Sequence, residues 1–91
     1  MKSQPERQLE QKCRRYARQH GFIMMKLEKN GHKGVPDDII LMPSGRFFLI
    51  EFKNGSLGHV RAEQQVFLER FKNCAFVVRD LETFKELLNN Q

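Results

Sequence analysis

Acidic and basic residues at the ends of two predicted strands carry the most chemical information in this 91-residue chain. Asp37 precedes one apolar run, a turn at 43–45 follows, and a second apolar run leads into Glu51 and Lys53. If Ser44 is the centre of a hairpin, residues equidistant from it face each other, so Asp37 lies opposite Glu51. Because strand side chains alternate, Lys53 shares that face with Glu51. The sequence therefore predicts two carboxylates and a lysine together on one face of a sheet.

Two facing carboxylates at the end of a hairpin indicate a bound cation, because like charges directly opposite one another destabilise a strand pair. Mg²⁺ takes oxygen ligands, commonly one or two carboxylates together with water and substrate phosphates. The chain has 16 Lys and Arg against 11 Asp and Glu, a formal charge of +5, which favours a polyanionic partner. These features together predict metal-dependent cleavage of nucleic acid.

Each half of this pattern has an ordinary structural interpretation. A proline at position 36 before Asp37 is typical of a loop-to-strand junction with a solvated acid, and Glu51 with Lys53 is typical of a surface ion pair. A site is favoured because the two halves must lie on adjacent strands, in register and on one face. By alternation Asp38 points to the opposite face, and we expect it to be a solvated acid at the strand start.

A helix over residues 3 to about 19 offers two further acids. Ser3 and Glu6 form a capping-box pattern at its start. Glu6 and Glu10 lie one turn apart on the flank of the apolar stripe that faces the sheet, and either could reach the metal. Because Glu6 has a structural role in the capping box, Glu10 is the better candidate.

Gln64 is a polar residue within the apolar stripe of a second predicted helix. A buried amide without a partner costs about 1–3 kcal/mol. Two interpretations stay open: Gln64 lies at the solvent edge of the stripe, or it bonds a site water, Lys53 or substrate.

The remaining pattern predicts one α/β domain over 1–91 with element order αβββαβα. We expect strands over 22–28, 47–50 and 75–78, and the run at 47–50 is apolar on both faces, as in a central strand. Asp80 is expected to cap a last helix. The apolar face of that helix consists of Leu81, Phe84, Leu87 and Leu88.

Cysteines and histidines show no spacing for metal binding. Cys13 and Cys74 are expected to fill the core, and His20, His32 and His59 to lie on the surface. With no signal peptide and no run of about 18 apolar residues, we expect a soluble, cytoplasmic protein that does not enter a membrane.

The motif set resembles the VRR-NUC family of the PD-(D/E)xK nuclease superfamily, in its short, stand-alone phage-type form. The G-x-P-D and E-x-K motifs are specific in combination, and the match covers nearly the whole chain. The step from Glu10 to Gly21 is also similar to that in archaeal Holliday junction resolvases, which supports Glu10 over Glu6. The residues that carry the resemblance are Glu10, Gly34-Val35-Pro36-Asp37, Glu51-Phe52-Lys53 and Gln64.

The resemblance implies a restriction-endonuclease-like αβββαβ core, with a central mixed sheet flanked by helices and an extra C-terminal helix. It implies Mg²⁺ or Mn²⁺ at Asp37, Glu51 and the Phe52 carbonyl, with Glu10 completing the site. Lys53 would orient or activate water. The catalytic set is then Glu10, Asp37, Glu51, Lys53 and Gln64.

By similarity, the protein is a homodimer in a phage or bacterial host cytosol that cuts branched DNA, above all four-way Holliday junctions. We expect DNA contacts from Lys26, Lys29, Lys33 and Gln64. The alternatives are a flap or nicking nuclease and a non-catalytic nucleic-acid-binding domain of the same fold. A third is a small interaction protein whose acidic cluster forms salt bridges with Lys53.

Overall fold

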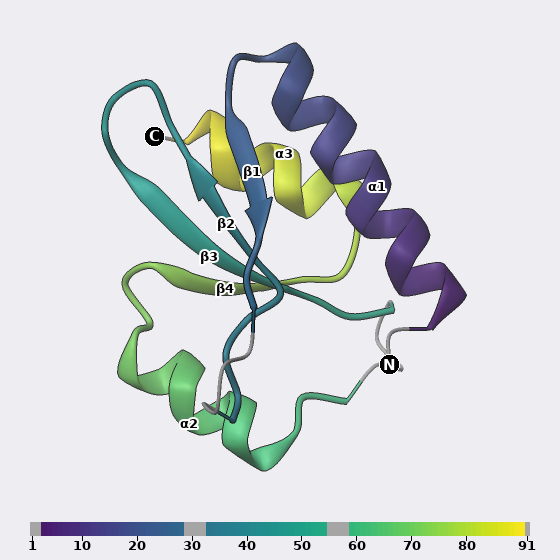
Figure 1. Cartoon of the computed structure of the whole chain (residues 1–91), viewed down its shortest axis with the longest axis vertical. Coiled ribbons are helices and arrows are strands. Elements are labelled where there is room, and N and C mark those ends of the chain that lie inside the picture. Colours follow the sequence, from purple (N-terminus) through teal and green to yellow (C-terminus); the bar gives the residue numbers. More distant parts are fainter. Residues whose placement is uncertain (1–2, 29–32, 55–58, 91) are drawn as a thin grey trace.

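The computed structural model describes residues 3–28, 33–54 and 59–90, and its elements follow the predicted order. The four strands form one sheet in the order β1-β2-β3-β4 (Figure 1). β1, β2 and β3 are antiparallel neighbours, whereas β3 and β4 are parallel, so the sheet is mixed and β3 is an interior strand, as predicted. The elements are α1 (Gln4–Gln19), β1 (Ile23–Lys26), β2 (Asp38–Leu41), β3 (Phe47–Phe52), α2 (Ala62–Arg70), β4 (Ala75–Val78) and α3 (Leu81–Asn89).

The hairpin of β2 and β3 has the register that the sequence predicts. Asp38 lies opposite Ile50 and Leu41 opposite Phe47, so the hairpin is centred on Ser44. Gly45 has a φ of +90°, a conformation that residues with a Cβ rarely adopt, and this allows the tight turn. The predicted placement of Asp37 and Glu51 depends on this register, which is now confirmed.

One face of the sheet carries the core, and α1 and α3 cover it (Figure 1). Alternate residues of the hairpin point into this core because strand side chains alternate. Burial raises the pKa of the Cys13 thiol to about 12, so this cysteine is a neutral apolar side chain, as expected. The largest fully buried apolar side chains of the core are Phe52, Phe84, Ile40, Ile50 and Val78.

The opposite face of the sheet is apolar but only partly covered. Ile23, Met25 and Phe47 are all exposed there. Their cross-strand neighbours Leu41 and Ile39 are half-buried. α2 lies near the end of the sheet at which β2 begins, next to the segment that leads into β2 (Figure 1).

The helix starts are capped largely as predicted. The Ser3 side chain accepts a hydrogen bond from the amide of Glu6 at 3.3 Å, and Asp80 accepts one from the amide of Thr83 at 2.7 Å. This bond lowers the pKa of Asp80. The Glu6 carboxylate accepts from the amide of Asn54 at 3.4 Å and so joins the start of α1 to the end of β3. Within the described residues, no helix is long and apolar enough to cross a membrane.

Candidate metal and nucleic-acid site

Asp37 and Glu51 come together where β2 begins and β3 ends. Both side chains are buried. The amide of Phe52 donates a hydrogen bond to Oδ2 of Asp37 at 2.9 Å, which places this carboxylate beside the peptide that joins Glu51 to Phe52. The backbone carbonyl of Asp37 accepts from the amide of Leu27, so the segment directly after β1 also holds this residue. Both acids belong to the sheet face opposite α1 and α3.

Glu51 is held by a lysine and an amide. Nζ of Lys53 lies 3.3 Å from Oε2 of Glu51, and Nε2 of Gln64 donates to the same oxygen at 2.8 Å. Oε1 of Gln64 accepts from the backbone amide of Arg61 at 3.0 Å. Gln64 is therefore buried and bonded at both ends, so the solvent-edge interpretation is wrong. Its partner is Glu51, which the sequence interpretation did not name.

Gly34 explains how α2 reaches the strands. Its φ is +84°, and a Cβ built on it would overlap the backbone carbonyl of Glu63 in the first turn of α2. Only glycine allows this close approach without displacing the backbone. The contact brings α2 against the segment before Asp37, and this position lets Gln64 reach Glu51.

Asp38 is not the solvated acid that the sequence pattern predicts; its exposed fraction is 0%. β2 turns this side chain towards α1, as alternation requires, but there it meets the helix and not solvent. Nη2 of Arg14 lies 3.3 Å from Oδ2 of Asp38 and 3.4 Å from Oε2 of Glu10. Sequence analysis missed Arg14, although the i, i+4 spacing of Glu10 and Arg14 was a signal for the pair.

Glu10 lies with Asp38 on the α1 side of the sheet. It is buried, and Nζ of Lys26 lies 3.5 Å from both of its carboxylate oxygens. Among residues 3–28, 33–54 and 59–90, no three His, Cys, Asp or Glu side chains are placed to hold one metal ion. The metal role of Glu10 therefore stays a prediction.

The other predicted residues lie around this site or outside the described part of the chain. Lys33 is exposed beside Gly34, whereas Lys29 and His32 fall outside the described residues. His20 is exposed and stacks on a tyrosine ring, and His59 is exposed, as expected. The DNA contacts predicted for Lys26, Lys33 and Gln64 stay predictions.

Comparisons with known proteins concern the fold. No family model matches the chain, and a search of curated proteins finds no match. A solved structure described as a VRR_NUC domain superposes with a TM-score of 0.85 over 96% of this chain and 97% of that chain, at 22% sequence identity. The chain therefore has the fold of a VRR_NUC domain, a mixed sheet with three helices, and the fold predicted from the motifs is confirmed.

Gln64 should contribute measurably to stability because both ends of its buried amide are bonded. We expect Gln64→Leu, which keeps the approximate volume, to lower the free energy of unfolding by about 1–3 kcal/mol. Gln11→Leu is the matched control, since Gln11 is exposed on α1, and its loss should stay within about 0.5 kcal/mol. Urea unfolding of both variants measures the difference. Equal stabilities would show that the bond to Glu51 does not stabilise the fold.

Proposed function

We propose that this protein is a metal-dependent endonuclease that hydrolyses DNA phosphodiester bonds, in the manner of the PD-(D/E)xK nucleases. The observation that carries the proposal is the arrangement of Asp37, Glu51 and Lys53 on one face at the ends of two adjacent strands. The Phe52 amide and Gln64 hold the two carboxylates in place. The fold shared with a VRR_NUC domain supports the same function.

The donor set suits Mg²⁺ or Mn²⁺. Asp37 and Glu51 would supply carboxylate oxygens, and the Phe52 carbonyl, one residue after Glu51, would be a further oxygen ligand. Two carboxylates suffice for Mg²⁺, which keeps several waters and binds substrate phosphates. When bound, the ion would lower the pKa of a coordinated water and offset negative charge on the phosphate. Glu10, if it takes part, would do so from the α1 side through water.

Lys53 is the residue of this chain placed to assist the attack of water. Its side chain is 12% exposed, and its ammonium contacts Glu51, so it lies at the edge of the site. From there it would orient the attacking water or offset charge on the phosphate in the transition state. Gln64 would keep Glu51 in the orientation needed to bind the ion, as second partners of metal ligands commonly do.

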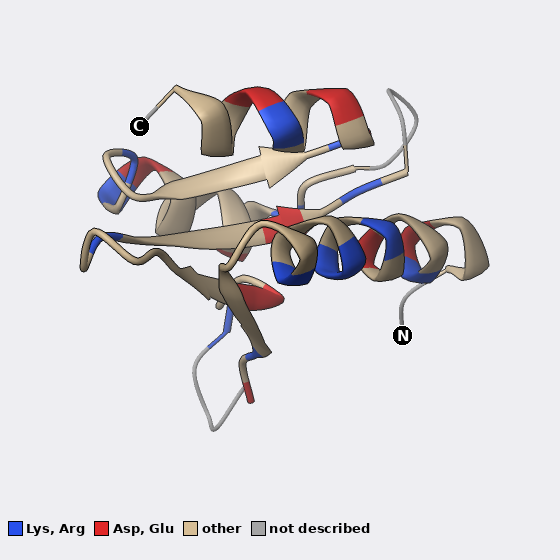
Figure 2. Ribbon diagram, turned by 90° about the horizontal axis from the view of Figure 1, so that it is seen from above, with Lys and Arg blue, Asp and Glu red and all other residues tan. Residues whose placement is uncertain are grey.

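Branched DNA, in particular the four-way junction, is the substrate that we propose, with a homodimer as the active form. The formal charge of +5 favours DNA, and Lys and Arg recur along α1 (Figure 2). A second copy would cover the exposed apolar sheet face around Phe47. Two active sites related by a twofold axis match a substrate with approximate twofold symmetry. A cytoplasmic location follows from this role.

Lys53→Ala tests the proposal because it should separate binding from cleavage. We expect four-way junction affinity within about twofold of wild type and a cleavage rate lower by at least about 100-fold. Lys85→Ala, which removes a lysine of α3 outside the proposed site, is the matched control and should cleave normally. Fluorescence anisotropy measures binding, and a panel of junction, flap, duplex and single strand with Mn²⁺ measures cleavage.

The same panel separates the alternatives. Binding without cleavage by the wild type would indicate a non-catalytic nucleic-acid-binding domain. The absence of both would favour an interaction protein in which Lys53 and Glu51 form a salt bridge. A wild type that is monomeric at working concentration and makes single nicks would be a flap or nicking nuclease.

A further inference from the structure

A groove of about 510 Å³ runs between α2 and the segment that leads into β2. Lys33 and Val35 form one side, and Val66, Phe67 and Phe71 contribute apolar surface on the other. Phe71 is 40% exposed and Val66 is 68% exposed. Such exposed apolar side chains on a short helix, beside a basic residue, indicate a surface that contacts another molecule.

Three planar groups of this groove lie next to one another. The rings of Phe67 and Phe71 have centroids 4.7 Å apart and are tilted by 43°, and the guanidinium carbon of Arg70 lies over the ring of Phe71, 5.7 Å from its centroid. Nucleobases stack on aromatic rings and on guanidinium planes when they are not paired in a helix. A base in a duplex presents only its edges in the grooves, so these planar side chains suit an unpaired base.

The charges of the groove suit the phosphates on either side of such a base. Lys33 and Arg70 are its two cations, and Glu63 is the acid among its lining residues. Cations beside stacking platforms are the arrangement by which proteins bind single-stranded nucleic acid.

The groove also lies beside elements that hold the proposed metal site. Its lining residue Glu63 packs through its backbone against Gly34, three residues before Asp37. The next residue of α2, Gln64, bonds Glu51. A DNA strand with one phosphate near Asp37 and Glu51 would therefore pass close to the groove.

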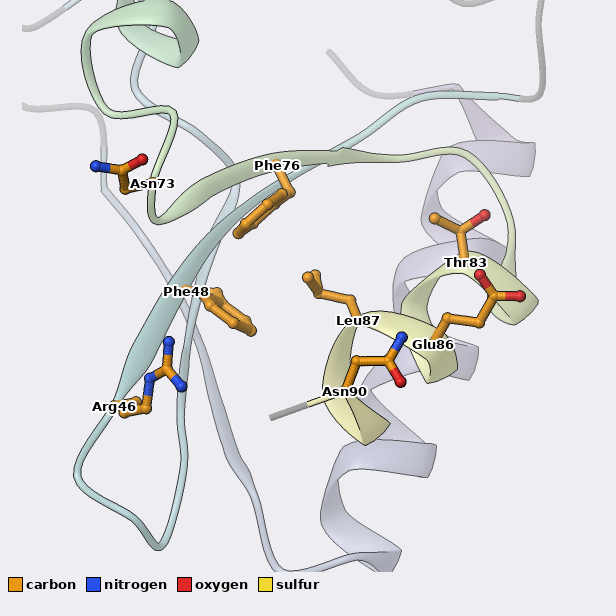
Figure 3. Close-up of a pocket in the computed structure, with 8 residues that line it drawn as sticks. All are labelled: Arg46, Phe48, Asn73, Phe76, Thr83, Glu86, Leu87 and Asn90. Carbon is orange, nitrogen blue, oxygen red and sulfur yellow. The ribbon is translucent and has the colours of Figure 1, made fainter.

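A second hollow, of about 410 Å³, lies at the other end of the sheet between the strands and α3 (Figure 3). Phe48 and Phe76 meet there edge to face, with ring centroids 5.0 Å apart, and Leu87 lies across from them. Its cation, Arg46, is at the hairpin turn, away from Asp37 and Glu51. The α2 groove is thus the one of these two hollows connected to the proposed site.

We propose that the α2 groove binds an unpaired nucleotide of the DNA substrate. The base lies against the rings of Phe67 and Phe71, and Lys33 and Arg70 contact the neighbouring phosphates. This inference rests on the proposed function and deepens it, because it gives the protein a reason to prefer DNA with an unpaired nucleotide beside the cleavage position.

Binding of two labelled DNAs, measured by anisotropy without divalent metal, tests the groove. One probe is a duplex with a single-stranded arm, and the other is a fully paired duplex of the same length. Phe71→Leu keeps an apolar side chain but removes the ring. We expect it to bind the arm probe at least about fivefold more weakly and the paired duplex within about twofold of wild type.

Matched variants and a base probe make the test specific. Phe76→Leu removes a half-buried ring of the second hollow, outside the α2 groove, and should bind both DNAs normally. Arg70→Gln should weaken arm binding, whereas Arg46→Gln should not. A 2-aminopurine base in the arm should lose fluorescence on binding wild type and keep more of it with Phe71→Leu, because stacking quenches it. Thermal melts confirm that each variant is folded.

An equal loss for both DNAs with Phe71→Leu, or no loss for either, would overturn the groove assignment. The outcome is separable from that of the proposed function, because these measurements use no metal and no cleavage. An arm-specific loss of binding in a protein that does not cut DNA would support the groove assignment and contradict the proposed nuclease activity. Normal cleavage without an arm-specific loss of binding would support the nuclease activity and contradict the groove assignment.

Discussion

Asp37→Asn is expected to abolish cleavage while the protein stays folded. Removing the negative charge should weaken Mn²⁺ binding and lower the cleavage rate by at least about 100-fold, since loss of even a second partner of a metal ligand costs 10- to 100-fold. The Asn side-chain oxygen can still accept the hydrogen bond from the amide of Phe52, so the strand ends should keep their geometry. Relief of the repulsion from Glu51 should leave the melting temperature equal or higher.

Calorimetric titration with Mn²⁺ and thermal melts measure these effects. Asp80→Asn is the matched control, because it also removes an aspartate charge and asparagine caps helices well. Its metal affinity and cleavage should equal those of wild type. Unchanged Mn²⁺ affinity in Asp37→Asn would refute the assignment of Asp37 as a ligand.

Arg14→Ala should cause a large loss of stability. It leaves Asp38, which is completely buried, and Glu10 without the guanidinium that contacts both. Breaking a buried ion pair from one side costs about 3–5 kcal/mol, and we expect a value near 3 because the Arg14 side chain is 37% exposed. At about 4–8 °C per kcal/mol for a domain of this size, the melting temperature should fall by roughly 12–24 °C.

Two further variants are controls for the expected loss of stability in Arg14→Ala. Arg15→Ala removes the adjacent, exposed arginine and should change stability by less than about 0.5 kcal/mol. Arg14→Met combined with Asp38→Asn removes both charges of the pair, so it should be more stable than Arg14→Ala. A loss below about 1 kcal/mol in Arg14→Ala would show that solvent compensates both acids.

Local pattern was enough to predict the elements and half of the site. The period of two along β3 determines that Glu51 and Lys53 share a face, and a turn centred on Ser44 determines the register that places Asp37 opposite Glu51. The helix caps at Ser3 and Asp80 could also be predicted from the sequence, because a cap and its partner lie within one turn of helix. These features involve neighbours in the chain or across one hairpin.

Only the tertiary structure decided which partners the buried polar groups meet. Alternation turned Asp38 away from Asp37, but whether solvent or a helix lay there depended on how α1 packs on the sheet, and it placed Arg14 there. In the same way, Gln64 reaches Glu51 because Gly34 lets α2 approach the strands. The α2 groove arises from that same approach. Contacts between elements far apart in sequence depend on how those elements pack. The periodicity of a single element gives no information about that packing.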